Sequence, residues 1–181
     1  MATLNFDGSK LYRAKGTPKL PPKVALALLN QSARTSSRSL YDPFCGGGTI
    51  LLCARKYFPN HYLTISGADI DPLAVEATRL NLLDSIPETE LLQNIVPRDA
   101  TKDTLPTGTD LIVTDPPFGR RCPVSEGFLE KAFLNFRNQN VQDIFFCYDG
   151  KTPLQNELKR IYTVKEFKRD WGRAFYHAQA K

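Results

Sequence analysis

The sequence predicts a single α/β domain in which helices connect the strands of a mostly parallel sheet. Short apolar runs of strand length alternate with helical stretches along the chain, and this alternation is typical of strands joined by crossover helices. Two of the expected helices have a proline in the first turn, a position where proline is favoured. The 181 residues, of which 41% are hydrophobic, are enough to bury one core.

The first expected elements surround a loop with several glycines. Residues 21–29 combine two prolines with an apolar run, which predicts a helix with proline in its first turn. Residues 39–41 have the composition of a short strand, and it ends at Asp42-Pro43. Residues 49–57 form the expected helix after the glycines.

The middle of the chain repeats this strand and helix order. Residues 63–68 predict a second strand, and residues 72–83 predict a helix with Pro72 in its first turn. Asp71 directly before that helix is suited to cap its N-terminus. Further strands are expected at 92–96 and 110–114.

The last third of the chain completes a sheet of about seven strands. A fifth strand is expected at 142–148, and helices are expected at 127–136 and 154–161. The tail, 163–178, predicts two closing strands around a turn near Trp171-Gly172. We therefore divide one domain, 1–181, into an N-terminal segment and helix (1–38), a core (39–150) and a C-terminal helix with two closing strands (151–181).

Charge is distributed unevenly along the chain, whose formal net charge is +5. Residues 1–41 carry seven Lys and Arg against one acid, residues 42–150 carry nine against fifteen, and residues 151–181 carry eight against three. Two basic ends therefore flank an acidic centre. Clustered positive charge attracts a polyanion such as nucleic acid, and solvated surface side chains without a ligand are the alternative.

Several classes of protein are disfavoured by the composition. No apolar run approaches the roughly 18–20 residues that a membrane span needs. The four cysteines contain no CxxC pair, which argues against a disulfide framework or a zinc site and suits a reducing compartment. The first 15 residues lack the apolar core of a signal peptide. We expect a cytoplasmic protein without a metal or a membrane anchor, and a weak mitochondrial signal is the alternative that stays open.

The glycine loop, residues 42–49 (Asp-Pro-Phe-Cys-Gly-Gly-Gly-Thr), joins an expected strand to an expected helix. Glycines let the backbone approach a ligand closely, and the helix N-terminus offers free N–H groups. A dinucleotide fingerprint would need glycine where Leu51 stands, and a phosphate loop would need Gly-Lys-Ser/Thr. The loop instead begins with Asp42, an acid suited to a cofactor with an ammonium group. A turn without a ligand is the alternative.

Acidic residues also follow the next two strands. In the segment Gly-Ala-Asp69-Ile-Asp71, a carboxylate at the strand end can accept hydrogen bonds from both hydroxyls of a ribose. We expect Asp69 to be this ligand and Asp71 to cap the helix, and the alternative is that both acids act as caps. Asp99, followed by Ala100, could lie against an adenine amino group.

The segment Asp115-Pro116-Pro117-Phe118 comes directly after the fourth strand and therefore projects from the carboxyl edge of the sheet. The two prolines stiffen the turn, and their carbonyls are free acceptors. A carboxylate and a carbonyl together can accept both N–H groups of an exocyclic base amine, and Phe118 can stack on the base. We predict these four residues to be the catalytic group, with a purely structural turn as the alternative.

Taken together, these motifs resemble the S-adenosylmethionine-dependent amino-methyltransferases, and they are most similar to the RNA guanine-N2 methyltransferases, over about residues 18–150. The resemblance implies a Rossmann-like class I methyltransferase fold, with a seven-stranded, mostly parallel sheet, a reversed last strand and helices on both faces. It also implies S-adenosylmethionine as the cofactor. The implied cofactor residues are Asp42, Phe44, Gly46 and Gly48 at the methionine part, Asp69 at the ribose, and Asp99 with Ala100 at the adenine, and Ile70 is a further expected cofactor residue.

The implied reaction is N-methylation of an exocyclic base amine in RNA, most closely guanine N2 in tRNA or rRNA. Asp115 would orient the amine, and Phe118 would stack the flipped base. One alternative is adenine N6 in DNA or RNA. Another is a protein glutamine amide, although Asn usually replaces Asp115 in that group. The last is an inactive subunit that binds RNA or assists assembly.

The chain also departs from the family pattern. Larger members carry a THUMP RNA-binding domain, and we expect none here. RNA recognition is therefore expected from the basic ends, from the loop that contains Arg120 and Arg121, or from a partner protein. Gly47 stands where the family usually has Ser or Thr, a change that removes no backbone contact.

Overall fold

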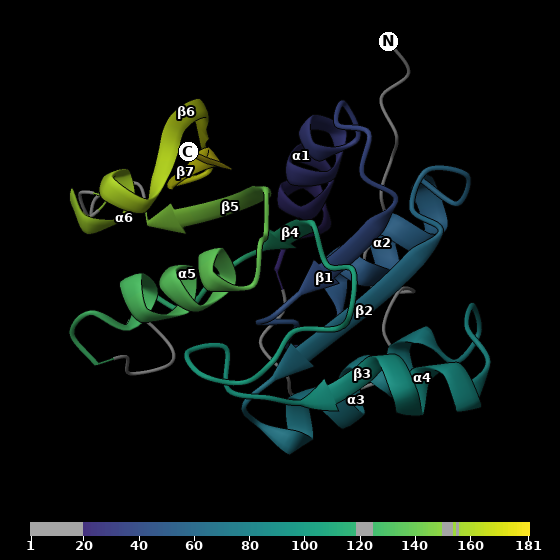
Figure 1. The fold of residues 1–181 in the computed structure, drawn as a ribbon. Coiled ribbons are helices and arrows are strands. Elements are labelled where there is room, and N and C mark those ends of the chain that lie inside the picture. The colour runs from purple at the N-terminus through teal and green to yellow at the C-terminus, as the bar shows by residue number, and fades with distance from the viewer. Residues whose placement is uncertain (1–19, 119–124, 150–153, 155) are drawn as a thin grey trace, which may run out of the picture.

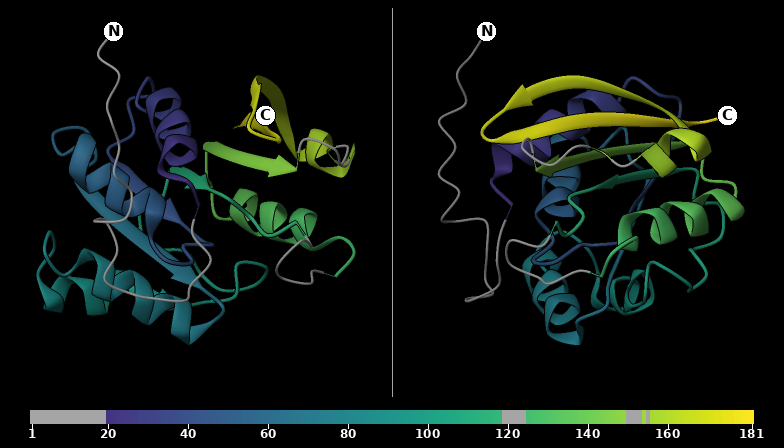
Figure 2. Two further views of the ribbon diagram at one scale, coloured as in Figure 1. Left: turned by 180° about the vertical axis from the view of Figure 1, so that it is seen from behind. Right: turned by 90° about the vertical axis from the view of Figure 1, so that its left-hand side faces the viewer.

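The computed structural model describes residues 20–118, 125–149, 154 and 156–181. Within these residues the chain forms one seven-stranded sheet in the order β3-β2-β1-β4-β5-β7-β6, and helices cover both of its faces (Figures 1 and 2). The strands are β1 (Ser39–Asp42), β2 (Thr64–Asp69), β3 (Ile95–Pro97), β4 (Leu111–Thr114), β5 (Asp143–Asp149), β6 (Tyr162–Asp170) and β7 (Arg173–Ala180). The helices are α1 (Pro22–Ser32), α2 (Thr49–Tyr57), α3 (Pro72–Leu82), α4 (Glu88–Asn94), α5 (Phe128–Asn138) and α6 (Asn156–Ile161).

The strand directions confirm a mostly parallel sheet with a reversed last strand. β1 pairs in parallel with β2 and β4, and β2–β3 and β4–β5 are also parallel pairs. β7, the last strand of the chain, runs antiparallel to both β5 and β6. The connections leave β1 toward β2 on one side and return to β4 on the other, and ligands bind at such a switch point in open α/β sheets.

Two apolar clusters lie on opposite faces of the sheet, because successive side chains of a strand point to opposite sides. Phe145 of β5 packs with the cluster that includes α1 and α2. Its neighbour Phe146 packs with the cluster that includes Phe133 and Phe136 of α5. Among the described residues, no helix is long and apolar enough to cross a membrane.

Most predicted elements agree with the structure to within three residues, but the helix α4 was not predicted. Residues 92–94 were expected in a strand but belong to α4, and β3 begins only at Ile95. Pro87 precedes α4, and Glu88 and Glu90 lie in its first turn, where acids interact favourably with the helix dipole. These start signals outweigh the short apolar run at Leu91 and Leu92.

Candidate functional site

The predicted motifs lie at the carboxyl edge of the sheet. The glycine loop follows β1, Asp69 ends β2, and Asp115 follows β4. The hairpin of β6 and β7 reaches the same edge, because the antiparallel register pairs Asp149, the last residue of β5, with Arg173, the first residue of β7. Four separate segments of the chain therefore meet beside the switch point.

Glycine is required by the backbone of the loop after β1. Gly46 and Gly48 have φ angles of +52° and +77°, in the left-handed region that favours glycine. A Cβ atom on Gly48 would lie 2.9 Å from Cγ2 of Thr78 in α3. A Cβ atom on Gly46 would have no neighbour within 4 Å, so the loop is tightly packed at Gly48 and open at Gly46.

Contacts from β2 and α3 fix this loop through its backbone. The Gly46 N–H donates to Oδ2 of Asp69 at 3.0 Å. Oγ1 of Thr78 donates to the Gly46 carbonyl at 2.7 Å, and Nδ2 of Asn81 donates to the Gly47 carbonyl at 2.9 Å. Thr78 and Asn81 were not predicted from the sequence, although their signal is visible there: they are polar residues one turn apart on the buried side of a helix.

Asp69 and Asp71 have different surroundings in the structure. Oδ1 of Asp71 accepts from the Leu73 N–H at 2.9 Å, which confirms Asp71 as the N-cap of α3. Asp69 also accepts from the Asp71 N–H at 3.0 Å. Burial raises the pKa of Asp69, and its backbone hydrogen bonds act in the opposite direction. Ile70 between the two acids is 70% exposed, so an apolar side chain is presented at this edge.

Asp42 lies buried beneath the loop and joins it to β4. Its Oδ1 accepts from the hydroxyl of Thr114 at 2.6 Å and from the Phe44 N–H at 3.1 Å. Burial raises the pKa of Asp42 to about 7, and the negative charges of Asp69 and Asp115 contribute in the same direction. A cation held near these three carboxylates would therefore favour the ionised form of Asp42.

Other predicted cofactor residues have structural contacts of their own. The ring of Phe44 packs against Phe128 and Phe136, with centroid distances of 5.7 and 6.5 Å. The carboxylate of Asp99 accepts from the N–H and the hydroxyl of Thr101, and these bonds hold its pKa below the usual range. Ala100 is buried. Asp99 is therefore oriented by its own turn.

Side chains from β5 and β7 hold the segment after β4. Sγ of Cys147 donates to Oδ1 of Asp115 at 3.2 Å, and the guanidinium of Arg173 forms an ion pair with the same oxygen. Arg173 also lies over the Phe118 ring, 5.0 Å from its centroid. The Phe118 ring meets that of Tyr148 edge-on at 5.7 Å. Arg173 and Cys147 were not predicted, because they lie far along the chain from Asp115.

The predicted substrate contacts Arg120 and Arg121 lie outside the described residues. Within the described parts of the chain, no group of three or more His, Cys, Asp and Glu side chains could hold a metal ion.

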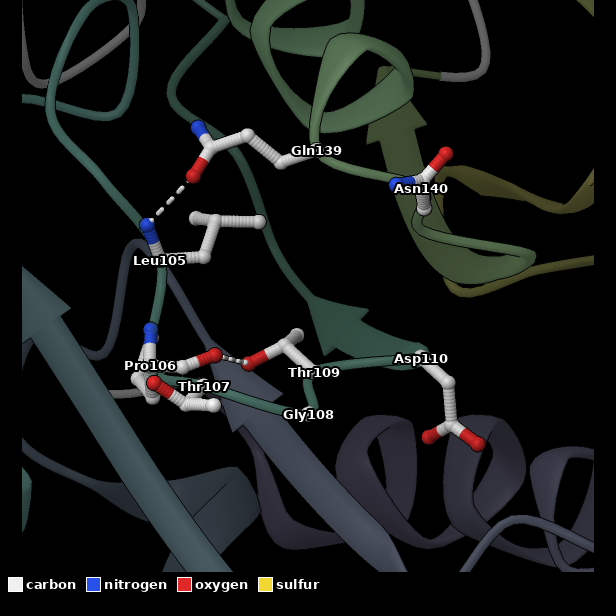
Figure 3. A pocket seen from close by; sticks show the side chains of 8 residues that line it. All are labelled: Leu105, Pro106, Thr107, Gly108, Thr109, Asp110, Gln139 and Asn140. Carbon is white, nitrogen blue, oxygen red and sulfur yellow. Dashed lines mark hydrogen bonds between the residues drawn. The ribbon is translucent and has the colours of Figure 1, made fainter.

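A hollow of about 400 Å³ lies at the opposite edge of the sheet. It is formed by the loop 105–110, before β4, and by Gln139 and Asn140, before β5 (Figure 3). Local hydrogen bonds occupy several of its polar groups, such as Oε1 of Gln139, which accepts from the Leu105 N–H. It contains none of the predicted site residues, so the carboxyl edge remains the candidate site.

Comparisons with known proteins agree on the class of this domain. The family model of the RMKL-like methyltransferase domain (UPF0020) matches residues 11–141. A tRNA (guanine(10)-N2)-dimethyltransferase of Methanothermobacter thermautotrophicus is 35% identical over 118 residues, which is 65% of this chain and 33% of that protein. The enzyme of the same name from Methanocaldococcus jannaschii is 29% identical over 151 residues, which is 79% of this chain and 41% of that protein. The chain thus spans about a third to two fifths of the length of these relatives.

Solved structures agree with the fold. The rRNA methyltransferase aviRa of Streptomyces viridochromogenes superposes with a TM-score of 0.69 and 15% identity, over 97% of this chain and 93% of that one. A 16S rRNA N2 methyltransferase of T. thermophilus superposes with a TM-score of 0.65 and 15% identity, over 94% of this chain and 45% of that one. Together with the strand order, these similarities establish the class I methyltransferase fold. The match over residues 11–141 identifies the chain as a member of the RMKL-like methyltransferase domain family.

Proposed function

We propose that this chain transfers a methyl group from S-adenosylmethionine to an exocyclic base amine in RNA, with guanine N2 of tRNA as the first expected target. One observation carries the proposal: the glycine loop and the Asp115 segment share one sheet edge, where the hydrogen bond from Thr114 to Asp42 joins them. The family match and the two relatives named as tRNA guanine-N2 dimethyltransferases support the same reaction.

The residues at this edge fit S-adenosylmethionine. The Asp69 carboxylate is held by the backbone of the glycine loop and could accept the ribose hydroxyls. The exposed side chain of Ile70 offers an apolar surface for an adenine ring. Asp42 provides negative charge for an ammonium group, and the open space beside Gly46 leaves room for a ligand. When bound, the cofactor supplies an electrophilic methyl group on sulfur.

The protein groups near the target amine would act by alignment. Asp115 would accept a hydrogen bond from the amine and take up or relay the proton that the nitrogen loses on methylation, and the carbonyls of the two prolines are acceptors for its second N–H group. This arrangement directs the nitrogen lone pair toward the methyl carbon. Holding the reacting atoms in such a geometry removes much of the barrier of a bimolecular reaction. Phe118 would hold the base by stacking, which is worth about 1–3 kcal/mol in single-strand binders.

The residues at the tip of the β6–β7 hairpin are suited to contact an RNA substrate. Trp171 is 40% exposed at the tip, and Nζ of Lys168 and of Lys23 lie 4.1 and 4.7 Å from its ring centroid. An aromatic ring beside cations is suited to single-stranded nucleic acid. The described cysteines, Cys45, Cys53 and Cys147, are buried and free, which suits a reducing compartment such as the cytoplasm.

The test is methylation by the 181-residue chain with tritiated S-adenosylmethionine. The RNA probes are unmodified tRNA transcripts and total cellular RNA, and the labelled nucleosides are identified after digestion. We expect label in N2-methylguanosine, formed at about a 100-fold lower rate or less by Asp115→Ala. Label in N6-methyladenosine would instead assign the adenine alternative.

Calorimetric titration with S-adenosylmethionine, and binding of the same RNAs by the chain alone, separate the remaining outcomes. Cofactor binding without transfer to any RNA would contradict the proposed reaction. Transfer that occurs only after another protein is added would assign RNA recognition to a partner.

A further inference from the structure

The last strand of the chain, β7, places an arginine beside the predicted catalytic segment. Arg173 is the first residue of β7, and the antiparallel register places it beside Asp149 at the carboxyl end of β5. β5 runs parallel to β4, with Thr114 beside Phe146. The start of β7 therefore lies at the edge from which Asp115 projects, although 58 residues separate Arg173 from Asp115 in the chain.

The Arg173 side chain contacts both functional groups of that segment. Its Nη1 donates to Oδ1 of Asp115, and its guanidinium lies 5.0 Å from the centroid of the Phe118 ring. Both members of the ion pair have side chains that are only 19% exposed. Partial burial reduces screening by solvent, so this contact constrains the two side chains more than a surface ion pair would.

The contacts of Cys147 and Arg173 also fix the orientation of the Asp115 carboxylate. Cys147 and Arg173 both approach Oδ1 of Asp115, so they set the plane of the carboxylate and the direction of its other oxygen. Since the planar guanidinium lies against Phe118 as well, the acid and the ring are held at a fixed separation. A base that stacks on the Phe118 ring while its amine donates a hydrogen bond to Asp115 needs the ring and the carboxylate at the correct relative position.

We propose that Arg173 is a positioning residue, which holds the Asp115 carboxylate and the Phe118 ring in the arrangement that the target amine requires. The inference rests on the proposed function, because it assigns Arg173 to the alignment step of that reaction. It acts through Asp115 and Phe118, and it leaves cofactor binding to the glycine loop and Asp69.

The test compares Arg173→Ala and Arg173→Lys with the wild-type chain on the RNA that the wild type methylates. For Arg173→Ala we expect kcat to fall by about 10- to 100-fold, since a misplacement of about 1 Å can cost that much. The calorimetric Kd of S-adenosylmethionine should stay within about twofold of the wild-type value. Arg173→Lys should recover only part of kcat, because an ammonium group cannot reproduce the planar guanidinium that donates to Asp115 and lies over the Phe118 ring.

Chemical rescue distinguishes positioning from support of the fold. Millimolar guanidinium chloride should restore part of the kcat of Arg173→Ala, whereas potassium chloride at the same concentration should not. The matched control is Arg137→Ala. Arg137 binds the opposite end of the C-terminal strand, where its Nη2 donates to the Lys181 carbonyl at 2.8 Å. If Arg173 merely anchored β7, the two alanine variants would behave alike.

Several outcomes would overturn the inference while wild-type methylation stands. They are a wild-type kcat in folded Arg173→Ala, a parallel loss of cofactor affinity, or an absence of guanidinium rescue. If the alanine variant fails to fold, folded Arg173→Lys must show the lowered kcat, and full activity of that variant would contradict the inference. An inactive wild-type chain contradicts the proposed function instead.

Discussion

The glycine loop and the Asp115 segment lie at the same sheet edge but are held in different ways. The glycine loop is fixed by contacts to its backbone, from Asp69, Thr78 and Asn81. The Asp115 segment is fixed by side-chain contacts from Cys147 and Arg173. Changes in the first region should therefore alter folding and cofactor binding together. Changes in the second region should alter the reaction while the fold persists.

The largest expected effect is that of Asp115→Ala on the rate of methyl transfer. The variant removes an acceptor whose interaction matters mainly in the transition state, so the single-turnover rate should fall about 100-fold or more. Cofactor affinity, measured by calorimetry on the same preparations, should change little. Asp110→Ala is the control, because Asp110 lies at the opposite end of the same strand. A wild-type rate for Asp115→Ala would contradict amine methylation, and a joint loss of rate and cofactor would assign Asp115 to the cofactor pocket.

Gly48→Ala should have the next largest effect, on folding. At φ +77° a non-glycine residue costs about 1–3 kcal/mol, and the new Cβ would also meet Thr78 at 2.9 Å. Gly108→Ala provides a matched control, because Gly108 has φ +79° and a Cβ there would have no neighbour within 4 Å. Urea unfolding should show a greater loss of stability for Gly48→Ala. Equal losses would mean that Thr78 yields without cost.

Asp69→Ala should weaken cofactor binding about tenfold or more, since hydrogen bonds to a charged acceptor contribute about 1.5–3 kcal/mol each. Asp71→Ala is the matched control two residues away. It removes the α3 cap and should cost about 1 kcal/mol of stability while cofactor affinity is retained. Calorimetry on both variants tests the ribose assignment, which unchanged affinity in Asp69→Ala would contradict.

The difference between the glycine loop and the Asp115 segment also explains which features were predictable from the sequence. The glycine loop, the Asp71 cap and the ends of the first five strands depend on local residue types. The structure has the loop and the cap where the sequence predicted them, and the ends of these strands lie within one residue of the predicted positions. The α4 helix was missed because its short apolar run resembles a strand. Arg173 and Cys147 could not be predicted, because their contact with Asp115 depends on the antiparallel register of β7 with β5. The buried contact of Asp42 with Thr114 likewise depends on the pairing of β1 with β4.

The smallest expected effect concerns the tip of the β6–β7 hairpin, where Trp171 is 40% exposed. Trp171→Ala should weaken binding of unmodified tRNA about fivefold, at the lower end of the ~1–3 kcal/mol of a stacked base. Trp171→Phe keeps an aromatic ring and should retain most of the affinity. Lys168→Glu should weaken binding to many RNAs alike and reduce its salt dependence, because phosphate contacts carry no sequence information. Fluorescence anisotropy at several salt concentrations measures both effects. If the affinity of Trp171→Ala for RNA is unchanged while Asp115→Ala still slows transfer, the Trp171 ring takes no part in holding the RNA.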